Sequence, residues 1–158
     1  MTERNPIRVF VTHAFSESDD YLRVFEFLEC VDRFYYINVS RPEEDPKSGN
    51  MEEIKDILIQ QIKAAEVVVV LPAVYETHPD LVNFMVTGAK AAGDPIIVIR
   101  PFGGVAETPQ ALVDVAHEHV EWNAREMADA ISRHARLEET NRWETVDFPG
   151  YDSDGEVK

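Results

Sequence analysis

Several features that would restrict the class of this protein are missing from its sequence. Cysteine occurs once, at Cys30, so no internal disulfide can form and nothing favours a secreted, disulfide-bonded domain. The amino terminus has no apolar signal segment, and the longest apolar run, residues 67–74, is far too short to cross a bilayer. We therefore expect a cytoplasmic protein that does not enter a membrane.

Positive charge is also scarce. Lysine and arginine number 15 against 30 aspartates and glutamates, which gives a formal net charge of −15. Such a chain repels nucleic acid and anionic lipid at long range, so we expect neither as a partner. The last 22 residues carry a net charge of −5. We interpret residues 1–136 as a single domain and residues 137–158 as an acidic C-terminal tail.

Motifs that bind phosphate or metal are absent as well. The segment that follows the first expected strand has neither the G-x-G-x-x-G spacing nor the P-loop spacing. A phospho-accepting receiver would need an aspartate at the end of the third strand, where this chain has Leu71 and Pro72. His13 and His78 are metal-ligand types, but no third ligand stands at a telling spacing, so we predict no metal site.

The sequence does contain a regular alternation of strands and helices. Runs of β-branched and aromatic residues predict five strands, at residues 7–12, 35–39, 66–72, 95–100 and 119–122. Capping residues predict helices that begin near Ser16 or Ser18, and near Asn50, Pro79, Thr108 and Asn123. This pattern is typical of an α/β flavodoxin-like three-layer sandwich, a five-stranded parallel sheet in the order 2-1-3-4-5 with helices on both faces.

Two of the expected helices have a clear apolar face. On the helix near Ser18, that face consists of Leu22, Phe25, Leu28 and Val31. On the helix that Asn50 opens, Ile54, Leu58 and Ile62 are expected to pack on the sheet. Both faces follow from a spacing of three or four residues, which places side chains above one another on a helix.

In a sheet of this order, ligands bind at the carboxyl ends of the strands, where the order reverses. The segments at that point follow the first and third strands. Their polar and aromatic side chains are our candidate ligand-binding residues: His13, Ser16, Ser18, Tyr75 and His78. Glu76 and Asp80 are the candidate catalytic carboxylates, although Asp80 also suits the first turn of a helix for electrostatic reasons alone.

Two stretches resemble a known family. Residues 8–20, RVFVTHAFSESDD, look like the opening box of TIR domains. Residues 59–99, from IQQIKAAEVVVVLPAVYETH to GDPIIVI, are similar to the middle of the TIR-like family that includes the Thoeris antiphage protein. The resemblance covers residues 7–136. Nucleoside deoxyribosyltransferases resemble the same helix and strand.

The resemblance implies a function, but this sequence departs from both families at the one position on which that function depends. Both families use a glutamate on this helix for chemistry at a ribosyl carbon, and the ungapped match to that glutamate here is Met85, between Phe84 and Val86. A thioether cannot accept a proton, but it can pack against a nucleobase, so Met85 joins the candidate ligand-binding residues. Met85 as a core residue facing the sheet is the alternative.

Two functional hypotheses follow from the resemblance. The first is a TIR-like signalling or scaffold protein without catalytic activity, which binds a nucleotide or a protein partner, or self-associates, through the strand-end segments. The second is an enzyme of the N-glycosidase or ribosyltransferase type that acts on NAD or a nucleoside through a displaced carboxylate. No cofactor is expected beyond NAD or a related nucleotide as ligand. The missing glutamate favours the first hypothesis.

Overall fold

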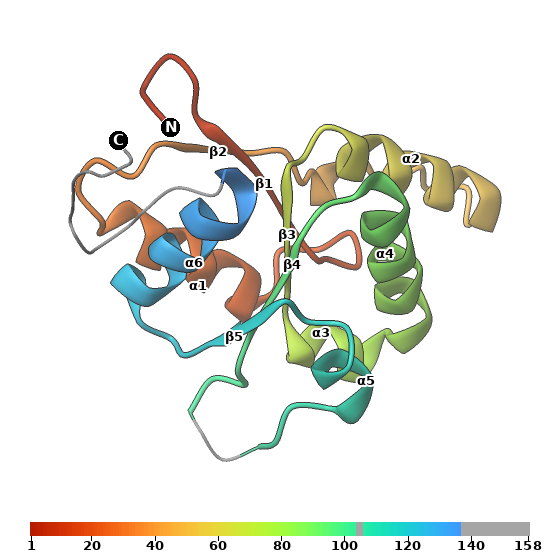
Figure 1. Ribbon diagram of the computed structural model, residues 1–158. Coiled ribbons are helices and arrows are strands. Elements are labelled where there is room, and N and C mark those ends of the chain that lie inside the picture. Colours follow the sequence, from red (N-terminus) through yellow and green to blue (C-terminus); the bar gives the residue numbers. More distant parts are fainter. Residues whose placement is uncertain (104–105, 137–158) are drawn as a thin grey trace.

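A computed structural model describes residues 1–103 and 106–136, which form helices around one parallel sheet. The strands are β1 (Ile7–Val11), β2 (Tyr36–Asn38), β3 (Val67–Val70), β4 (Ile96–Ile99) and β5 (Glu118–Val120). Their order across the sheet is β2-β1-β3-β4-β5, and each neighbouring pair is parallel (Figure 1). The structure thus confirms the flavodoxin-like topology predicted from the sequence.

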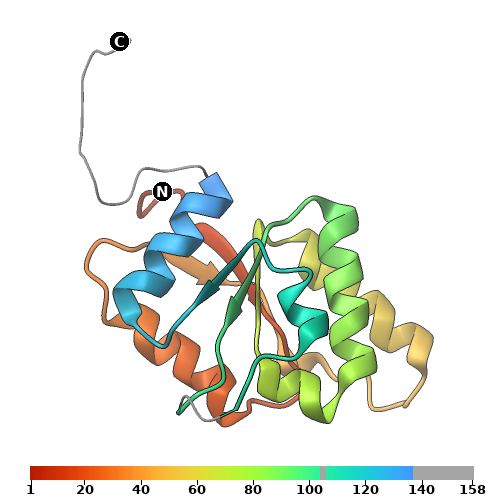
Figure 2. The same ribbon diagram turned by 60° about the horizontal axis from the view of Figure 1, so that its bottom comes forward.

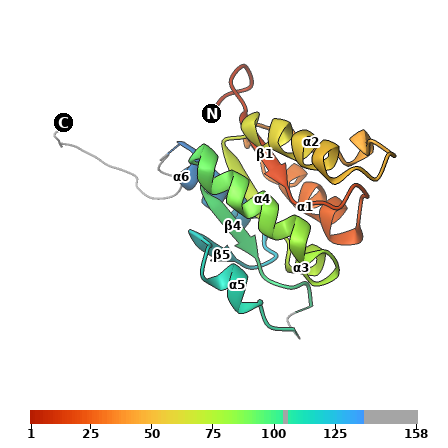
Figure 3. The ribbon, with the colours of Figure 1, turned by 90° about the vertical axis from the view of Figure 1, so that its right-hand side faces the viewer.

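The helices form two layers, one on each face of this sheet. They are α1 (Asp19–Glu29), α2 (Met51–Lys63), α3 (Pro72–Thr77), α4 (Pro79–Ala92), α5 (Gln110–Val113) and α6 (Ala124–Arg136), and a 3₁₀ helix, η1, spans Pro42–Glu44. Figures 1 and 2 show α1 and α6 on one face and α2 and α4 on the other. Figure 3 looks onto the second face, where α4 runs across the sheet beside α2. The sheet is therefore covered on both sides, as a parallel sheet requires.

The central strands have no polar alternation because both of their faces are covered. All four residues of β3 and all four of β4 are buried. Helices contribute the other walls of the core: Leu28 from α1, Leu58 and Ile62 from α2, Met85 from α4 and Met127 from α6 are at most 1% exposed. Ile54 is only partly buried but packs against the same core. The predicted sheet-facing side of α2 is thereby confirmed at Leu58 and Ile62.

The buried face of α1 differs from the one predicted. Its buried residues are Tyr21, Val24 and Leu28, whereas Leu22 is 43% exposed. Phe25 and Val31 are partly buried at the edge of the core. The prediction was wrong at Leu22 because the preceding residue is a tyrosine, which can bury its ring and still form a hydrogen bond through its hydroxyl. Tyr21 does so, through a 2.9 Å hydrogen bond to Ser40. Apolar spacing alone does not reveal this.

Two glycines have a structural reason for their positions. Gly93 ends α4 in the left-handed conformation with φ of 78°, which lets the backbone N–H of Asp94 bond the carbonyl of Ala89 at 2.9 Å. Gly88 lies where α2 and α4 meet. A Cβ atom there would stand 3.0 Å from the Cδ1 atom of Ile59, so glycine permits the close approach of the two helices.

The segment after β3 is helical, although a loop was expected there. Pro72 begins α3, since its fixed φ suits a first helical position and it needs no hydrogen-bond acceptor. The backbone N–H of His78 donates to the carbonyl of Val74 at 2.8 Å and ends the helix. Pro79 then begins α4 immediately, so two helices meet at His78. This arrangement turns the chain sharply at the carboxyl edge of the sheet.

The predicted division of the chain at residue 136 falls at the last residue that the structure describes and stays a prediction. The acidic tail predicted for residues 137–158 lies outside the described residues. Within residues 1–103 and 106–136, no helix has the length and apolar character that crossing a bilayer would require.

Candidate functional site

A pocket of about 260 Å³ opens at the carboxyl edge of the sheet, between the segments that follow β1 and β3. From the β1 side it is lined by Ala14, Ser16, Ser18, Asp19 and Asp20. From the β3 side it is lined by Ala73, Val74, Thr77 and His78. β1 and β3 are neighbours in the sheet. Successive strands are added to one side of β1 before this point and to the other side after it, so the strand order reverses between β1 and β3. The pocket therefore lies at the switch point at which ligands were expected.

The ends of β1 and β3 are tied together directly beneath this pocket. The backbone N–H of Thr12 donates to the carbonyl of Val69 at 3.0 Å, which continues the strand pairing by one residue. The hydroxyl oxygen of Thr12 accepts from the backbone N–H of Leu71, also at 3.0 Å. Thr12 is fully buried, so these bonds are shielded from water. The two pocket walls are thus held at a fixed spacing.

The wall on the β1 side is the first turn of α1. Ser18 caps this helix, because its hydroxyl oxygen accepts from the backbone N–H of Tyr21 at 3.3 Å. Asp19 and Asp20 follow in the first turn, where a negative charge interacts favourably with the helix dipole. Asp20 also forms an ion pair with Arg23, one turn further along. The sequence SESDD therefore both starts the helix and places two carboxylates at the pocket.

The wall on the β3 side contains a hydroxyl and an imidazole in contact. The hydroxyl of Thr77 donates to the carbonyl of Val74 at 3.2 Å, so its oxygen remains available as an acceptor. His78 Nδ1 lies 2.9 Å from that oxygen, which makes the Nδ1–H group the donor. His78 is exposed, so its Nε2 atom is available for a hydrogen bond to a ligand.

His13 supports the pocket from below and does not line it. It is 1% exposed, and its two ring nitrogens bond to protein: Nε2 lies 2.9 Å from Gln61 Oε1, and Nδ1 accepts from the backbone N–H of Phe15 at 3.0 Å. Burial lowers the pKa of His13, an effect that the Gln61 bond and the nearby Glu43 and Glu44 only partly offset. A neutral ring with its proton on Nε2 satisfies both bonds.

The bond from His13 also shapes the loop above it. Phe15 has a positive φ of 62°, which is uncommon for a residue with a side chain. Its N–H is held by His13 Nδ1 in that conformation. The chain then turns toward Ser16, which lines the pocket. The expectation that His13 binds the ligand is thus corrected to a role in holding the loop.

Gln61 is a residue of this region that sequence reasoning missed. It is 5% exposed, and its Oε1 atom accepts from both His13 and the backbone N–H of Arg41, each at 2.9 Å. Its amide nitrogen donates to the Arg41 carbonyl at 3.1 Å and to Glu44 at 3.2 Å. Gln61 thereby joins α2 to the β1 segment and to η1. The available signal was a single polar side chain on the apolar face of α2.

The other predicted site residues divide between the pocket, the core and the surface. Ser16, Ser18 and His78 line the pocket as expected. Tyr75 is partly buried against the core and lies outside the lining, and Glu76 and Asp80 are exposed outside it. Asp19, Asp20 and Thr77 line the pocket but were not among the predicted site residues.

Met85 occupies the core. It is fully buried, belongs to the main hydrophobic cluster and does not line the pocket. The structure therefore corrects the expectation that Met85 borders the cleft, and supports the alternative of a packing residue. A long, unbranched thioether suits such a position because it adapts to irregular space between helix and sheet.

Within residues 1–103 and 106–136, no group of three or more histidine, cysteine, aspartate or glutamate residues is placed to hold a metal ion. The chemistry of the pocket in this part of the chain therefore rests on hydroxyls, two carboxylates and one imidazole.

Comparisons with known proteins find similarity only among solved structures. No protein-family model and no curated protein sequence matches the chain. A CMP N-glycosidase from Clostridium botulinum, BcmB, is similar with a TM-score of 0.44 and 16% identity, over 79% of this chain and 97% of that one. A 3-dehydroquinate dehydratase-like protein from Bifidobacterium longum has a TM-score of 0.45 and 14% identity, over 87% of this chain and 98% of that one. Similarity at this level assigns neither a residue nor an activity.

Proposed function

We propose that this chain is a TIR-like signalling or scaffold domain that binds a small ligand of the nucleotide class in the strand-end pocket and does not turn it over. The observation that carries the proposal is the position and lining of the pocket. It lies at the switch point of the sheet, and both of its walls present hydrogen-bonding side chains. Concave sites of this kind, with a few polar groups around apolar walls, are the usual ligand sites of α/β proteins.

The absence of catalysis in this proposal rests on Met85. The TIR-like resemblance places the reactive glutamate at this position, and the side chain here is a buried thioether without acid–base chemistry. A positioned general acid or base is worth about 10²–10⁴-fold in rate. Position 85 lies in the core and outside the pocket lining, so neither its residue nor its place supplies such a group to the pocket. Glu76 and Asp80 do not line the pocket and are poorly placed to supply one.

One observation favours the enzyme hypothesis as a second candidate. Asp19 and Asp20 both line the pocket, so carboxylates are present, although on α1 instead of α4. Asp20 is engaged by Arg23, whereas Asp19 is exposed in the first turn. Asp19 is therefore the better candidate for a displaced carboxylate that acts at the ribosyl carbon of NAD or a nucleoside.

One experiment separates the two candidates. NAD and adenosine are titrated into the purified full chain, with binding followed by NMR and turnover by chromatography of the mixture. We expect saturable shifts at Ser16–Asp20 and Thr77–His78 and no products after overnight incubation. Titrations that leave these resonances unchanged would contradict ligand binding in the pocket.

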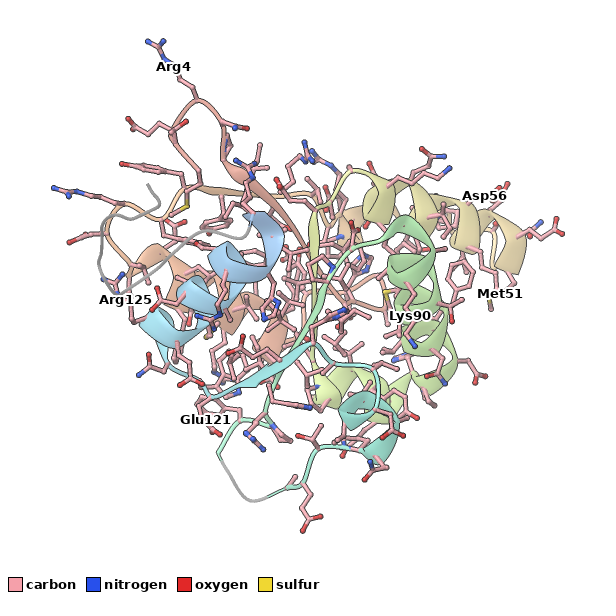
Figure 4. All side chains as sticks on the ribbon, viewed as in Figure 1. Arg4, Met51, Asp56, Lys90, Glu121 and Arg125 are labelled. Atoms are coloured by element: carbon pink, nitrogen blue, oxygen red, sulfur yellow. The ribbon has the colours of Figure 1, made fainter. Side chains whose placement is uncertain are left out.

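The carboxylates are tested in the same assays. Asp19→Asn and Asp20→Asn are compared with Asp56→Asn, which removes the same charge from the outer side of α2 (Figure 4). Turnover by the wild type that survives Asp56→Asn and is abolished by Asp19→Asn would establish the enzyme instead. Binding without turnover in the wild type and the control supports the signalling or scaffold domain.

Association with a protein partner or with a second copy belongs to the same proposal. β2 is an edge strand, and Ile37 on it is 49% exposed. Sedimentation of the full chain over a range of concentrations tests self-association. A monomer at every concentration would restrict this part of the proposal to other partners.

A further inference from the structure

Phe102 keeps an exposed ring although two neighbours hold it in place. It follows β4 at the carboxyl edge of the sheet and is 51% exposed. The guanidinium carbon of Arg23 lies 3.8 Å from the ring centroid, so the cation covers one face of the ring. The ring of Trp122 packs edge-on against Phe102, with centroids 5.5 Å apart and an interplanar angle of 78°.

Trp122 is itself fixed, so the arrangement around Phe102 is rigid. Its indole N–H donates to the carbonyl of Arg100 at 2.7 Å, across the ends of β4 and β5. Its ring also packs edge-on against Phe27 of α1, with centroids 5.4 Å apart. Phe102 is thus presented to solvent by a framework that is already ordered. A ring held in this way loses little conformational freedom when a flat group stacks on it.

Two successive contacts connect Phe102 to the pocket. Asp20 lines the pocket and pairs with Arg23, and Arg23 stacks on Phe102. Figure 2 shows the segment after β4 beside the start of α1 at the carboxyl edge. The exposed ring is therefore linked to the pocket through Arg23, whose guanidinium group contacts both Phe102 and the pocket residue Asp20.

The charge of the pocket disfavours phosphate. Its described lining contains the carboxylates of Asp19 and Asp20 and neither lysine nor arginine. Asp20 and the nearby Arg23 offset each other as an ion pair, so Asp19 supplies the net negative charge of this wall. A phosphate placed here meets like charge close by, whereas carboxylate and hydroxyl oxygens accept hydrogen bonds from sugar hydroxyls.

We propose that Phe102 and the pocket form one ligand site, which selects a molecule with a flat aromatic group, stacked on Phe102, and a hydroxyl-bearing group without phosphate in the pocket. The chemical class is an unphosphorylated nucleoside. This inference rests on the proposed function, that the pocket binds a ligand. It replaces the nucleotide of that proposal by a nucleoside, so NAD, which carries two phosphates, should bind more weakly than adenosine. It makes Phe102 the residue that determines specificity for the aromatic group.

The test compares three probes in the full chain: adenosine, AMP and ribose. Adenosine should bind best, and AMP about tenfold more weakly because its phosphate meets the carboxylate of Asp19. Phe102→Leu should weaken adenosine binding about five- to tenfold, because stacking is lost while an apolar side chain remains. The same substitution should leave the weak binding of ribose unchanged, which separates a stacking role from a general loss of the pocket.

Two matched variants keep the test decisive. Phe84→Leu makes the same change on α4, at a ring that also contacts a cation, Lys55, and it should bind adenosine as the wild type does. Phe102→Tyr keeps the ring and should retain adenosine binding. The Trp122 indole N–H resonance supplies a second readout, since it should shift with adenosine and not with ribose.

The outcomes distinguish this inference from the function on which it rests. Adenosine binding that is equal in wild type and Phe102→Leu overturns the role of Phe102 and leaves the proposed function intact. AMP that binds as tightly as adenosine overturns the exclusion of phosphate. Failure of the wild type to bind adenosine, AMP or NAD at millimolar concentration overturns the proposed function and this inference together.

Discussion

Met85 lies where the resemblance to TIR-like proteins places a catalytic acid, yet its side chain is sealed in the core. A carboxylate introduced there meets apolar side chains and no partner charge. We predict that Met85→Glu lowers the free energy of unfolding by about 3–5 kcal/mol, as uncompensated buried charges do, and does not produce NAD turnover. Met85→Leu, which conserves volume, should cost less than about 1.5 kcal/mol. Denaturant titration of both variants measures the difference.

The result for Met85 has a clear contrary outcome. A Met85→Glu protein as stable as the wild type would show that the side chain reaches water. If that protein also consumed NAD, position 85 would border the reaction site. The reaction would then involve a site other than the pocket described above.

Asp94 is a second residue whose surroundings oppose its charge. Burial raises the pKa of Asp94 to about 6, an effect that Arg8 reduces and Glu66 increases. Its Oδ2 atom is buried and has no hydrogen-bond partner within the described residues. The residue also directly follows the C-cap of α4, where the helix dipole disfavours a negative charge. The neutral carboxyl group is therefore the form that suits the folded state.

The pH dependence of stability follows from this raised pKa. The unfolded carboxyl ionises near pH 4 and the folded one near pH 6, so the contribution of Asp94 is complete below about pH 4 and is lost as the pH rises through 6. We predict that Asp94→Asn raises the melting temperature at pH 7.5 and changes it little at pH 4. Asp56→Asn, an exposed site with the same charge change, is the control. An equal gain at both pH values would contradict the assignment.

At the scale of elements, α2 illustrates how a helix is attached to the sheet. Asn50 caps it with bonds of 2.8 and 3.4 Å to the backbone N–H groups of Glu52 and Glu53. Leu58 is fully buried and Ile62 is 1% exposed, so one face of the helix is sealed against the core. We predict that Leu58→Ala lowers the free energy of unfolding by about 2–5 kcal/mol, as large-to-small changes in cores do.

Denaturant titration measures this loss, and Ile57→Ala provides the comparison on the same helix. Ile57 is only partly buried, so its truncation should cost less than that of Leu58. A loss below about 1 kcal/mol for Leu58→Ala would mean that the helix does not pack on the sheet as described.

The elements that the sequence predicted well are those whose signal is local. The all-apolar runs of β3 and β4 and the capped start of α2 are such signals, and they sufficed to indicate a parallel sheet. The start of α3 at Pro72 was missed because Pro72 directly follows the apolar run of β3 and was assigned to that strand. The buried face of α1 depends on a bond between Tyr21 and Ser40, 19 residues apart, which spacing cannot reveal.

The sequence predicted the location of the site better than it predicted the residues that line it. The order of the strands was enough to place it at the ends of β1 and β3, where Ser16, Ser18 and His78 were expected and line the pocket. Asp19 and Asp20 were not among the predicted site residues, because acids in the first turn of a helix already have an electrostatic explanation. His13 and Met85 were placed in the site, although burial, which a single sequence does not show, keeps both out of it.

At the scale of the whole molecule, charge sets the range of partners. The net charge is −15, and it remains −10 without the 22 residues of the predicted tail, so the exclusion of polyanions does not depend on that tail. Arginines on the described part of the chain are engaged locally: Arg136 bonds Glu66 at 2.7 Å, Arg133 bonds Glu118 at 2.8 Å and Arg23 pairs with Asp20. These three guanidinium groups already have carboxylate partners, which makes them poorly suited to track a phosphate backbone.

We therefore predict negligible binding of the full chain to duplex or single-stranded DNA at 150 mM salt. A protein that neutralises several phosphates gains about 10³–10⁵-fold in affinity when salt is lowered from 200 to 50 mM, because counterions are released. Fluorescence anisotropy with labelled DNA at micromolar protein should show no rise at either salt concentration. A rise that grew as the salt was lowered would reveal a cationic surface. It would also weaken the argument that phosphate is kept out of the pocket, since the field of the whole molecule and the carboxylate of Asp19 act on a phosphate in the same direction.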